Sequence, residues 1–279
     1  MSRIQNILEK AEREGAVRRI RAVAEPAAIA SSPIADSASP PVMSPAPPAP
    51  EPQPVVPAVA DPLDPSLRIV SGMRLHPILA AAISGTAAEQ YRALRTRILH
   101  TDNGSAVNVI LVTSPGRGEG KSITAANLSL TMAQEYQRRI CVVDADLRSP
   151  QLQHLFGLPD GAGLSDVLLG HASLDDAIVT VEDHDIAVLP AGHMSVHPAE
   201  LLGTTMMRRT MDTLRSRFDR VVIDAPAASP LADIGILTPL VDRVLLVVRA
   251  GVTSRPAIHD AIAAIDAAKL LGIVLNEAA

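Results

Sequence analysis

The sequence has 279 residues, is 47% hydrophobic and 1% aromatic, and carries a formal net charge of -5. This length allows one large α/β domain with additional segments, and the scarcity of aromatic residues requires an aliphatic core. No apolar run reaches about 18 residues, so no transmembrane helix is predicted. The net charge gives no indication of nucleic-acid binding, and the single cysteine, Cys141, excludes an internal disulfide.

Residues 1–24 have the spacing of an amphipathic helix. Ile4, Ile7, Leu8 and Ala11 recur at the i, i+3, i+4 and i+7 positions, and acidic residues within this pattern argue against a signal peptide. Such a helix could dock on a partner or on a membrane surface, or it could simply be solvated. The sequence leaves these interpretations open.

Residues 25–66 hold thirteen of the 23 prolines and no glycine, which predicts an extended linker without a core of its own. Residues 67–279 form the predicted globular domain, in which apolar runs alternate with helical patterns. The predicted strands are Val107–Thr113, Ile140–Val143, Ile186–Leu189, Val221–Ile223, Val244–Val248 and Ile273–Leu275. The predicted helices are Ser122–Glu135, Leu164–Leu169, Thr205–Phe218, Ile234–Leu240 and Ala257–Ala268. Continuous apolar strands that alternate with helices indicate a doubly wound, mostly parallel α/β sheet.

The first predicted strand runs into a glycine-rich loop that ends in Gly120-Lys121-Ser122, and a helix follows. This context is that of a P-loop, in which backbone N–H groups and the helix N-terminus hold phosphate. Lys121 is expected to reach the β- and γ-phosphates of ATP, and the Ser122 hydroxyl to ligate Mg²⁺. Pro115 stands where the strict motif has its first glycine. The expected nucleotide-binding residues of the loop are Gly116, Gly118, Glu119, Gly120, Lys121, Ser122 and Ile123.

Three further strands end in polar residues that suit such a site. Asp144 and Asp146 follow one strand, and they could hold Mg²⁺, orient a nucleophile or pair with a nearby arginine. Asp224 follows a second strand in a Walker B pattern, which predicts a role in holding the metal ion. Asn276 ends the last strand, where its amide could meet a base edge or cap the strand. A zinc site at His193 and His197 is not predicted, because the proline that follows disfavours a continuous helix there.

These motifs, in this order, resemble the bacterial tyrosine kinases and related ATPases of capsule and exopolysaccharide synthesis, in particular those associated with exosortase loci. The resemblance spans about residues 77–276. It rests on Glu89-x-x-Arg92-x-x-Arg95, Ser114–Ser122, Val143–Pro150, Gly163–Gly170, Pro198–Leu202, and Asp224-Ala-Pro226 followed by Asp233.

The resemblance implies a role for each matching residue. Lys121, Asp144 and Asp146 would be catalytic, and Ser122, Asp144 and Asp224 would bind Mg²⁺. Asn276 would lie beside the adenine. Glu89, Arg92 and Arg95 would pack between subunits of a homo-oligomeric ring.

The resemblance also implies cofactors, partners and a location. ATP and Mg²⁺ would be required, and a membrane-embedded chain-length-determinant adaptor of polysaccharide export would be the partner, with no nucleic acid involved. We expect a cytoplasmic protein that is held at the inner face of the plasma membrane through this partner.

The sequence departs from the family in its acceptor tyrosines. The family's kinases end in a tyrosine cluster, whereas this sequence has only Tyr91 and Tyr136. Arg117 also replaces a proline that is common in the family's loop, and His197 replaces an asparagine. Two alternatives to a tyrosine kinase therefore stand: an ATP-gated assembly regulator without phosphotransfer, and a positioning ATPase. The second lysine that positioning ATPases carry early in the P-loop is absent here.

Overall fold

The computed structural model describes residues 67–79, 86–101, 107–135, 138–194, 197–228 and 233–277. The predicted N-terminal helix (1–24), the predicted linker (25–66) and Tyr136 lie outside the described residues. No helix in the described part of the chain is long and apolar enough to cross a membrane.

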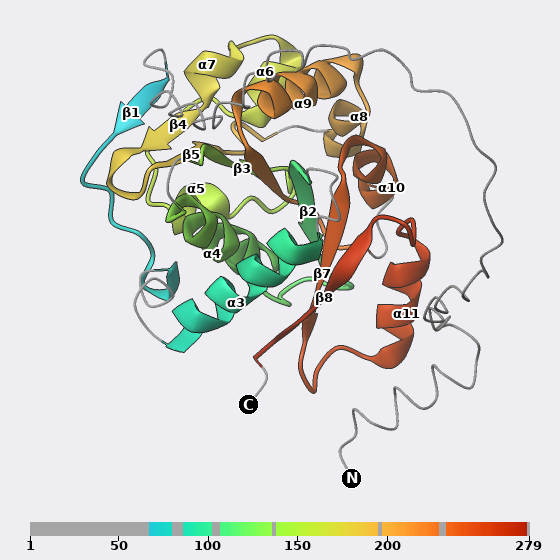
Figure 1. Cartoon of the computed structure of the whole chain (residues 1–279). Coiled ribbons are helices and arrows are strands. Elements are labelled where there is room, and N and C mark those ends of the chain that lie inside the picture. The colour runs from blue at the N-terminus through green and yellow to red at the C-terminus, as the bar shows by residue number, and fades with distance from the viewer. Residues whose placement is uncertain are drawn as a thin grey trace, which may run out of the picture. The chain divides into compact units, whose positions relative to one another are not determined.

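Within these residues, one sheet of eight strands forms the centre of the domain (Figure 1). The strands are β1 (Arg68–Val70), β2 (Val109–Thr113), β3 (Ile140–Asp144), β4 (Val179–Val181), β5 (Ile186–Leu189), β6 (Arg220–Asp224), β7 (Arg243–Arg249) and β8 (Leu270–Asn276). Their order is β1-β4-β5-β3-β6-β2-β7-β8, and all neighbours are parallel except β4 and β5. The predicted mostly parallel sheet is confirmed.

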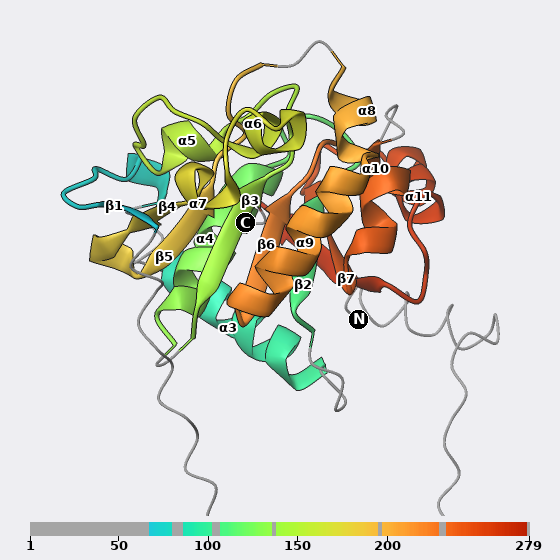
Figure 2. The same cartoon turned by 90° about the horizontal axis from the view of Figure 1, so that it is seen from above.

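Helices cover both faces of this sheet (Figures 1 and 2). One face packs against α3 (Thr86–Thr101), α4 (Lys121–Ala133) and α5 (Leu152–Leu155). The other face packs against α6 (Leu164–Leu169), α7 (Leu174–Ala177), α8 (Pro198–Leu202), α9 (Thr205–Arg217), α10 (Asp233–Leu237) and α11 (Arg255–Ala263). The described elements also include two short 3₁₀ turns, η1 (Glu182–His184) and η2 (Thr238–Leu240).

The strands are continuously apolar because their alternating side chains enter two separate cores. In β2, Val109 and Leu111 join the core under α9, whereas Ile110 and Val112 join the core under α4. All four side chains are fully buried. Burial on both faces is the physical reason for the unbroken apolar run that the sequence shows.

The predicted elements differ from the structure in three places. The predicted helix over 234–240 divides at Thr238, because Pro239 has no N–H to continue the α-helical bonding and a 3₁₀ turn takes over. The helix predicted to reach Ala268 ends at Ala263, and a turn closed by Lys269 N donating to Asp266 O follows. The short strands β1 and β4 and the short helices α5, α7 and α8 were not predicted.

Candidate functional site

The P-loop joins β2 to α4, which begins at Lys121. Gly118 and Gly120 have φ angles of 74° and 92°, a left-handed conformation that side chains disfavour. A Cβ atom at Gly120 would also stand 2.2 Å from Nδ2 of Asn276. The glycines therefore permit both the turn of the loop and its close contact with the end of β8.

Lys121 lies among carboxylates at the start of α4. Its Nζ atom is 2.7 Å from Oδ2 of Asp146 and 3.6 Å from Oδ1 of Asp224, and it donates to the Ser122 hydroxyl at 3.2 Å. Burial lowers the pKa of Lys121, but the charges of Asp224, Asp146 and Asp144 outweigh it and raise the pKa. Lys121 therefore stays protonated at neutral pH despite being only 7% exposed.

Asp144 and Asp224 are register partners at the ends of the adjacent strands β3 and β6. Asp144 Oδ2 accepts from the backbone N–H groups of Gln151 and Leu152, both at 2.9 Å, and Oδ1 accepts from Asp146 N at 3.2 Å. Burial and the charge of Asp224 raise the pKa of Asp144 to about 8. The strand stops at Asp144, so Asp146 lies beyond it and reaches Lys121 from the following turn.

Asp224 is fully buried, and no donor among the described residues makes a hydrogen bond of good geometry to its carboxylate oxygens, although Ser122 and Lys121 lie close enough to lower its pKa. Burial raises its pKa to about 6 against the opposing charge of Lys121. A buried carboxylate with free acceptor capacity beside a serine hydroxyl suits Mg²⁺, which uses one or two carboxylates together with phosphate and water. No group of three His, Cys, Asp or Glu side chains suited to a metal is found in the described part of the chain, so an all-protein metal cage is not present there.

A pocket of about 470 Å³ opens above these groups, and we call it the P-loop pocket. Of the predicted nucleotide-site residues, it is lined by Gly118, Gly120, Lys121, Ser122, Ile123, Asp146 and Asn276. Asp144 and Asp224 are buried and do not line it. Gly116 and Glu119 line a second hollow on the other side of the loop. The sequence did not predict that His76, Gln151 and His154 line the P-loop pocket, because no motif marks them.

The loop is held in shape by two predicted residues. Glu119 Oε1 accepts from Gly116 N at 3.0 Å, and burial raises the pKa of this carboxyl. Asn276 donates from Nδ2 to the backbone oxygen of Glu119 at 3.0 Å. The amide predicted to meet a base therefore also ties the end of β8 to the P-loop.

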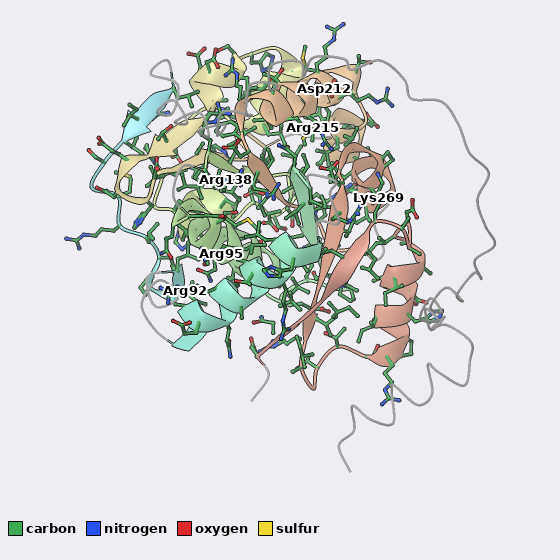
Figure 3. The ribbon with its side chains drawn as sticks, in the orientation of Figure 1. Arg92, Arg95, Arg138, Asp212, Arg215 and Lys269 are labelled. Carbon is green, nitrogen blue, oxygen red and sulfur yellow. The ribbon has the colours of Figure 1, made fainter. Side chains whose placement is uncertain are left out.

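The three residues predicted to join subunits lie on α3, and Figure 3 labels the two arginines. Arg92 pairs with Glu89 one turn earlier on the same helix. Arg95 donates from Nη1 to the backbone oxygen of Thr131 at 2.7 Å, so it caps the last turn of α4. Both arginines thus have partners within the chain, and their role between subunits stays a prediction.

The AAA domain family model matches residues 107–271. The tyrosine-protein kinase YwqD of Bacillus subtilis is 34% identical over 208 residues, which cover 74% of this chain and 87% of the relative. The chain belongs to the bacterial tyrosine kinase family. The kinase domain of the Escherichia coli tyrosine kinase ETK superposes with a TM-score of 0.68 at 25% identity, and the match covers 74% of this chain and 83% of that domain.

A longer relative is matched only in part. The succinoglycan biosynthesis transport protein ExoP of Rhizobium meliloti is 33% identical over 209 residues, 73% of this chain but 26% of ExoP. In the present chain, Tyr91 is half-buried on α3 and lines a hollow beside the P-loop pocket.

Proposed function

We propose that this chain binds Mg²⁺ and ATP in the P-loop pocket and transfers the γ-phosphoryl group to protein tyrosine. The observation that carries the proposal is the position of Lys121, which lies between Asp146 and Asp224 at the start of α4. A lysine there can exchange its carboxylate partners for phosphate oxygens when a nucleotide arrives. The kinase names of YwqD and ETK support the same reaction.

In this proposal, different residues bind the phosphates, hold the metal ion and accept the proton. Lys121 and the N–H groups of the P-loop bind the phosphates, and Ser122 and Asp224 hold Mg²⁺, with Asp144 beside them. Bound Mg²⁺ would neutralise charge on the β- and γ-phosphates. The tyrosine oxygen forms a bond to the γ-phosphorus, the bond to ADP breaks, and Asp146 accepts the phenolic proton. We assign the proton to Asp146 because the Asp144 oxygens already accept three backbone hydrogen bonds.

The biological setting belongs to the same proposal. The chain would serve the synthesis and export of an exopolysaccharide, as the name of ExoP suggests for that relative. A membrane adaptor of the chain-length-determinant type would hold it at the inner face of the plasma membrane. Glu89, Arg92 and Arg95 would join copies of the chain into a ring, which requires the contacts of Arg92 and Arg95 within α3 and α4 to be exchanged or extended.

Phosphotyrosine mapping by mass spectrometry tests the proposal. The chain is incubated with ATP, Mg²⁺ and a tyrosine-containing copolymer, and Tyr91, Tyr136 and the copolymer are examined. Phosphotyrosine that is lost in both Lys121→Met and Asp146→Asn, with circular dichroism unchanged, would support the kinase. Absence of phosphotyrosine from every acceptor while ATP still binds would reject it and favour the ATP-gated regulator, which the scarcity of tyrosines already makes the second candidate.

A further inference from the structure

Arg117 stands at the tip of the P-loop and is exposed to solvent. It lines the P-loop pocket together with Lys121 and Ser122, and it also lines the second hollow. Its guanidinium forms no hydrogen bond or ion pair with the described part of the chain. An arginine at this place is therefore available to a ligand.

The charges around the P-loop pocket create a need for such a cation. Lys121 is already paired with Asp146 and Asp224, and fully buried Asp144 adds a third carboxyl next to them. The lining also includes Glu277, whose carboxylate pairs with Arg249 outside the lining at 2.7 Å. The single positive charge of Lys121, already shared with carboxylates, is small compared with the negative charge of a triphosphate, which is about four before Mg²⁺ binds.

Among the described residues that line the P-loop pocket, Arg117 is the only arginine, and Lys121 is the only lysine. The two histidines of the lining, His76 and His154, contact each other with ring centroids 5.3 Å apart. An arginine stays protonated at any physiological pH and can offer several N–H donors to phosphate oxygens. Arg117 is thus the side chain best suited to supply the missing positive charge.

Open space beside Arg117 permits its side chain to move toward the nucleotide. Gly116 precedes it and Gly118 follows it. A Cβ atom at Gly118 would meet nothing within 4 Å, so the loop is unobstructed there. Closure removes water from this exposed guanidinium, and charge-assisted hydrogen bonds to the phosphate oxygens offset that cost.

We propose that Arg117 closes over bound ATP and donates to the γ-phosphate of the nucleotide in its own subunit, as a second phosphate-binding cation beside Lys121. This deepens the proposed function and rests on ATP being the ligand of the P-loop pocket. During transfer, the bond from the acceptor oxygen to phosphorus forms and the bond to the leaving ADP breaks. Arg117 stabilises the charge on the γ-phosphoryl oxygens and takes up no proton.

Calorimetric binding of two nucleotides tests the assignment. The full chain, Arg117→Ala and Arg117→Lys are titrated with Mg·ADP and with the Mg complex of the non-hydrolysable β,γ-imido analogue of ATP. Arg209→Ala is the matched control, because Arg209 is an exposed arginine on α9 outside the pocket lining. We expect Arg117→Ala to weaken binding of the analogue about tenfold and binding of ADP less than twofold. Arg117→Lys should retain part of the difference, and the control should change neither.

Two outcomes would overturn the assignment. If Arg117→Ala loses the same affinity for ADP as for the analogue, Arg117 does not contact the γ-phosphate. If neither affinity changes, Arg117 does not contact the nucleotide in the P-loop pocket. A mixing experiment tests the choice of subunit: phosphorylation restored by combining Lys121→Met with Arg117→Ala would show that Arg117 acts on a neighbouring copy. Nucleotide binding is measured without phosphotransfer, so a chain that lacks kinase activity but shows the γ-phosphate preference would reject the kinase and keep Arg117.

Discussion

The Oδ2 atom of Asp144 lies 2.9 Å from the backbone nitrogen of Leu152, so a carboxylate at the end of β3 holds the start of α5. The same helix carries His154 and Leu155, which line the P-loop pocket. Asp146 instead contacts Lys121. Two aspartates that the sequence presents as a matched pair therefore have different tasks, one in shaping a wall of the pocket and one in its charge balance.

Replacement of Asp144 should therefore affect folding more than replacement of Asp146. Asp144→Ala leaves the N–H groups of Gln151 and Leu152 without their acceptor, and we expect a loss of about 2 kcal/mol in the free energy of unfolding. Asp146→Ala removes the acceptor of one backbone N–H, that of Ser149, and one of the two carboxylates that pair with Lys121. It should cost less, because Asp224 still neutralises Lys121. Urea unfolding of both variants measures the difference. Equal or smaller loss in Asp144→Ala would mean that relief of repulsion from Asp224 offsets the lost hydrogen bonds.

Lys121→Met should reduce stability as well as nucleotide binding, because it leaves buried carboxylates without a cation. We expect a loss of about 3 kcal/mol at pH 8. The folded-state pKa values of Asp144 and Asp224, about 8 and about 6, lie above the ordinary value of 3.8. The native state thus holds more protons than the unfolded state over this interval, and the contribution of these groups to stability falls as pH rises from about 4 to about 8.

The cost of Lys121→Met should consequently be smaller at pH 5.5 than at pH 8, as measured by urea unfolding at both pH values. Lys269→Met is the matched control (Figure 3), since Lys269 Nζ donates to the backbone oxygens of Thr238, Pro239 and Val241 and pairs with no described carboxylate. Its cost should be the same at both pH values. A pH-independent cost for Lys121→Met would contradict the coupling to the carboxylates.

Gly120→Ala should abolish nucleotide binding and lower the melting temperature. The new Cβ would stand 2.2 Å from Nδ2 of Asn276, and the residue would keep a φ of 92°. Adding Asn276→Ala removes the clash but not the backbone cost, which is about 1–2 kcal/mol. The double variant should thus recover part of the lost stability, and a double-mutant cycle measures this recovery. A double variant that is no more stable than Gly120→Ala would show that the contact with Asn276 is not limiting.

Asp166 should stabilise the loop after β5 in a pH-dependent manner. Its carboxylate accepts from Gly163 N at 2.9 Å and from His193 N at 3.2 Å, and it lies 2.8 Å from His193 Nδ1. Burial alone would raise the pKa of Asp166, but these hydrogen bonds with Gly163 and His193 outweigh it and lower the pKa below 3.8. The stabilisation is therefore present above pH 3.8 and is lost as pH falls through the folded-state value.

Asp166→Asn should lower the free energy of unfolding by about 1–3 kcal/mol at pH 7. The difference in the free energy of unfolding between this variant and the unmodified chain should become smaller below pH 3.8. Urea unfolding between pH 3 and pH 7 measures it. Asp212→Asn, an exposed change on α9, serves as the control (Figure 3). A gap that stays constant down to pH 3 would argue against a charged Asp166 in the folded state.

Much of the sheet could be predicted from the sequence because its central strands are buried on both faces. β1 and β4 could not, since each has three residues and β1 is half exposed, so both depend on pairing with each other and with β5 rather than on a local pattern. Part of the site could be predicted in the same way. Parallel strands bring Lys121, Asp146 and Asn276 to one edge of the sheet, and the positions of these residues after strands predict this.

The hydrogen bonds of Asp144 depend on the turn from Ala145 to Gln151, whose path no periodic pattern encodes. The ion pair between Arg148 and Asp233, at 3.1 Å, joins the turn after β3 to the start of α10, 85 residues apart in sequence. Contacts of this kind follow from the folded backbone, and the identity of the residues alone does not specify the partner.

The scarcity of aromatic residues also leaves the protein without indole fluorescence. The sequence contains no tryptophan, and its two phenylalanines, Phe156 and Phe218, are buried. A tryptophan introduced at Ile78, which lines the P-loop pocket and is 42% exposed, would be the sole indole in the molecule. Its emission would report the arrival of a nucleotide without background from other indoles, so binding could be followed in real time with unlabelled ligand.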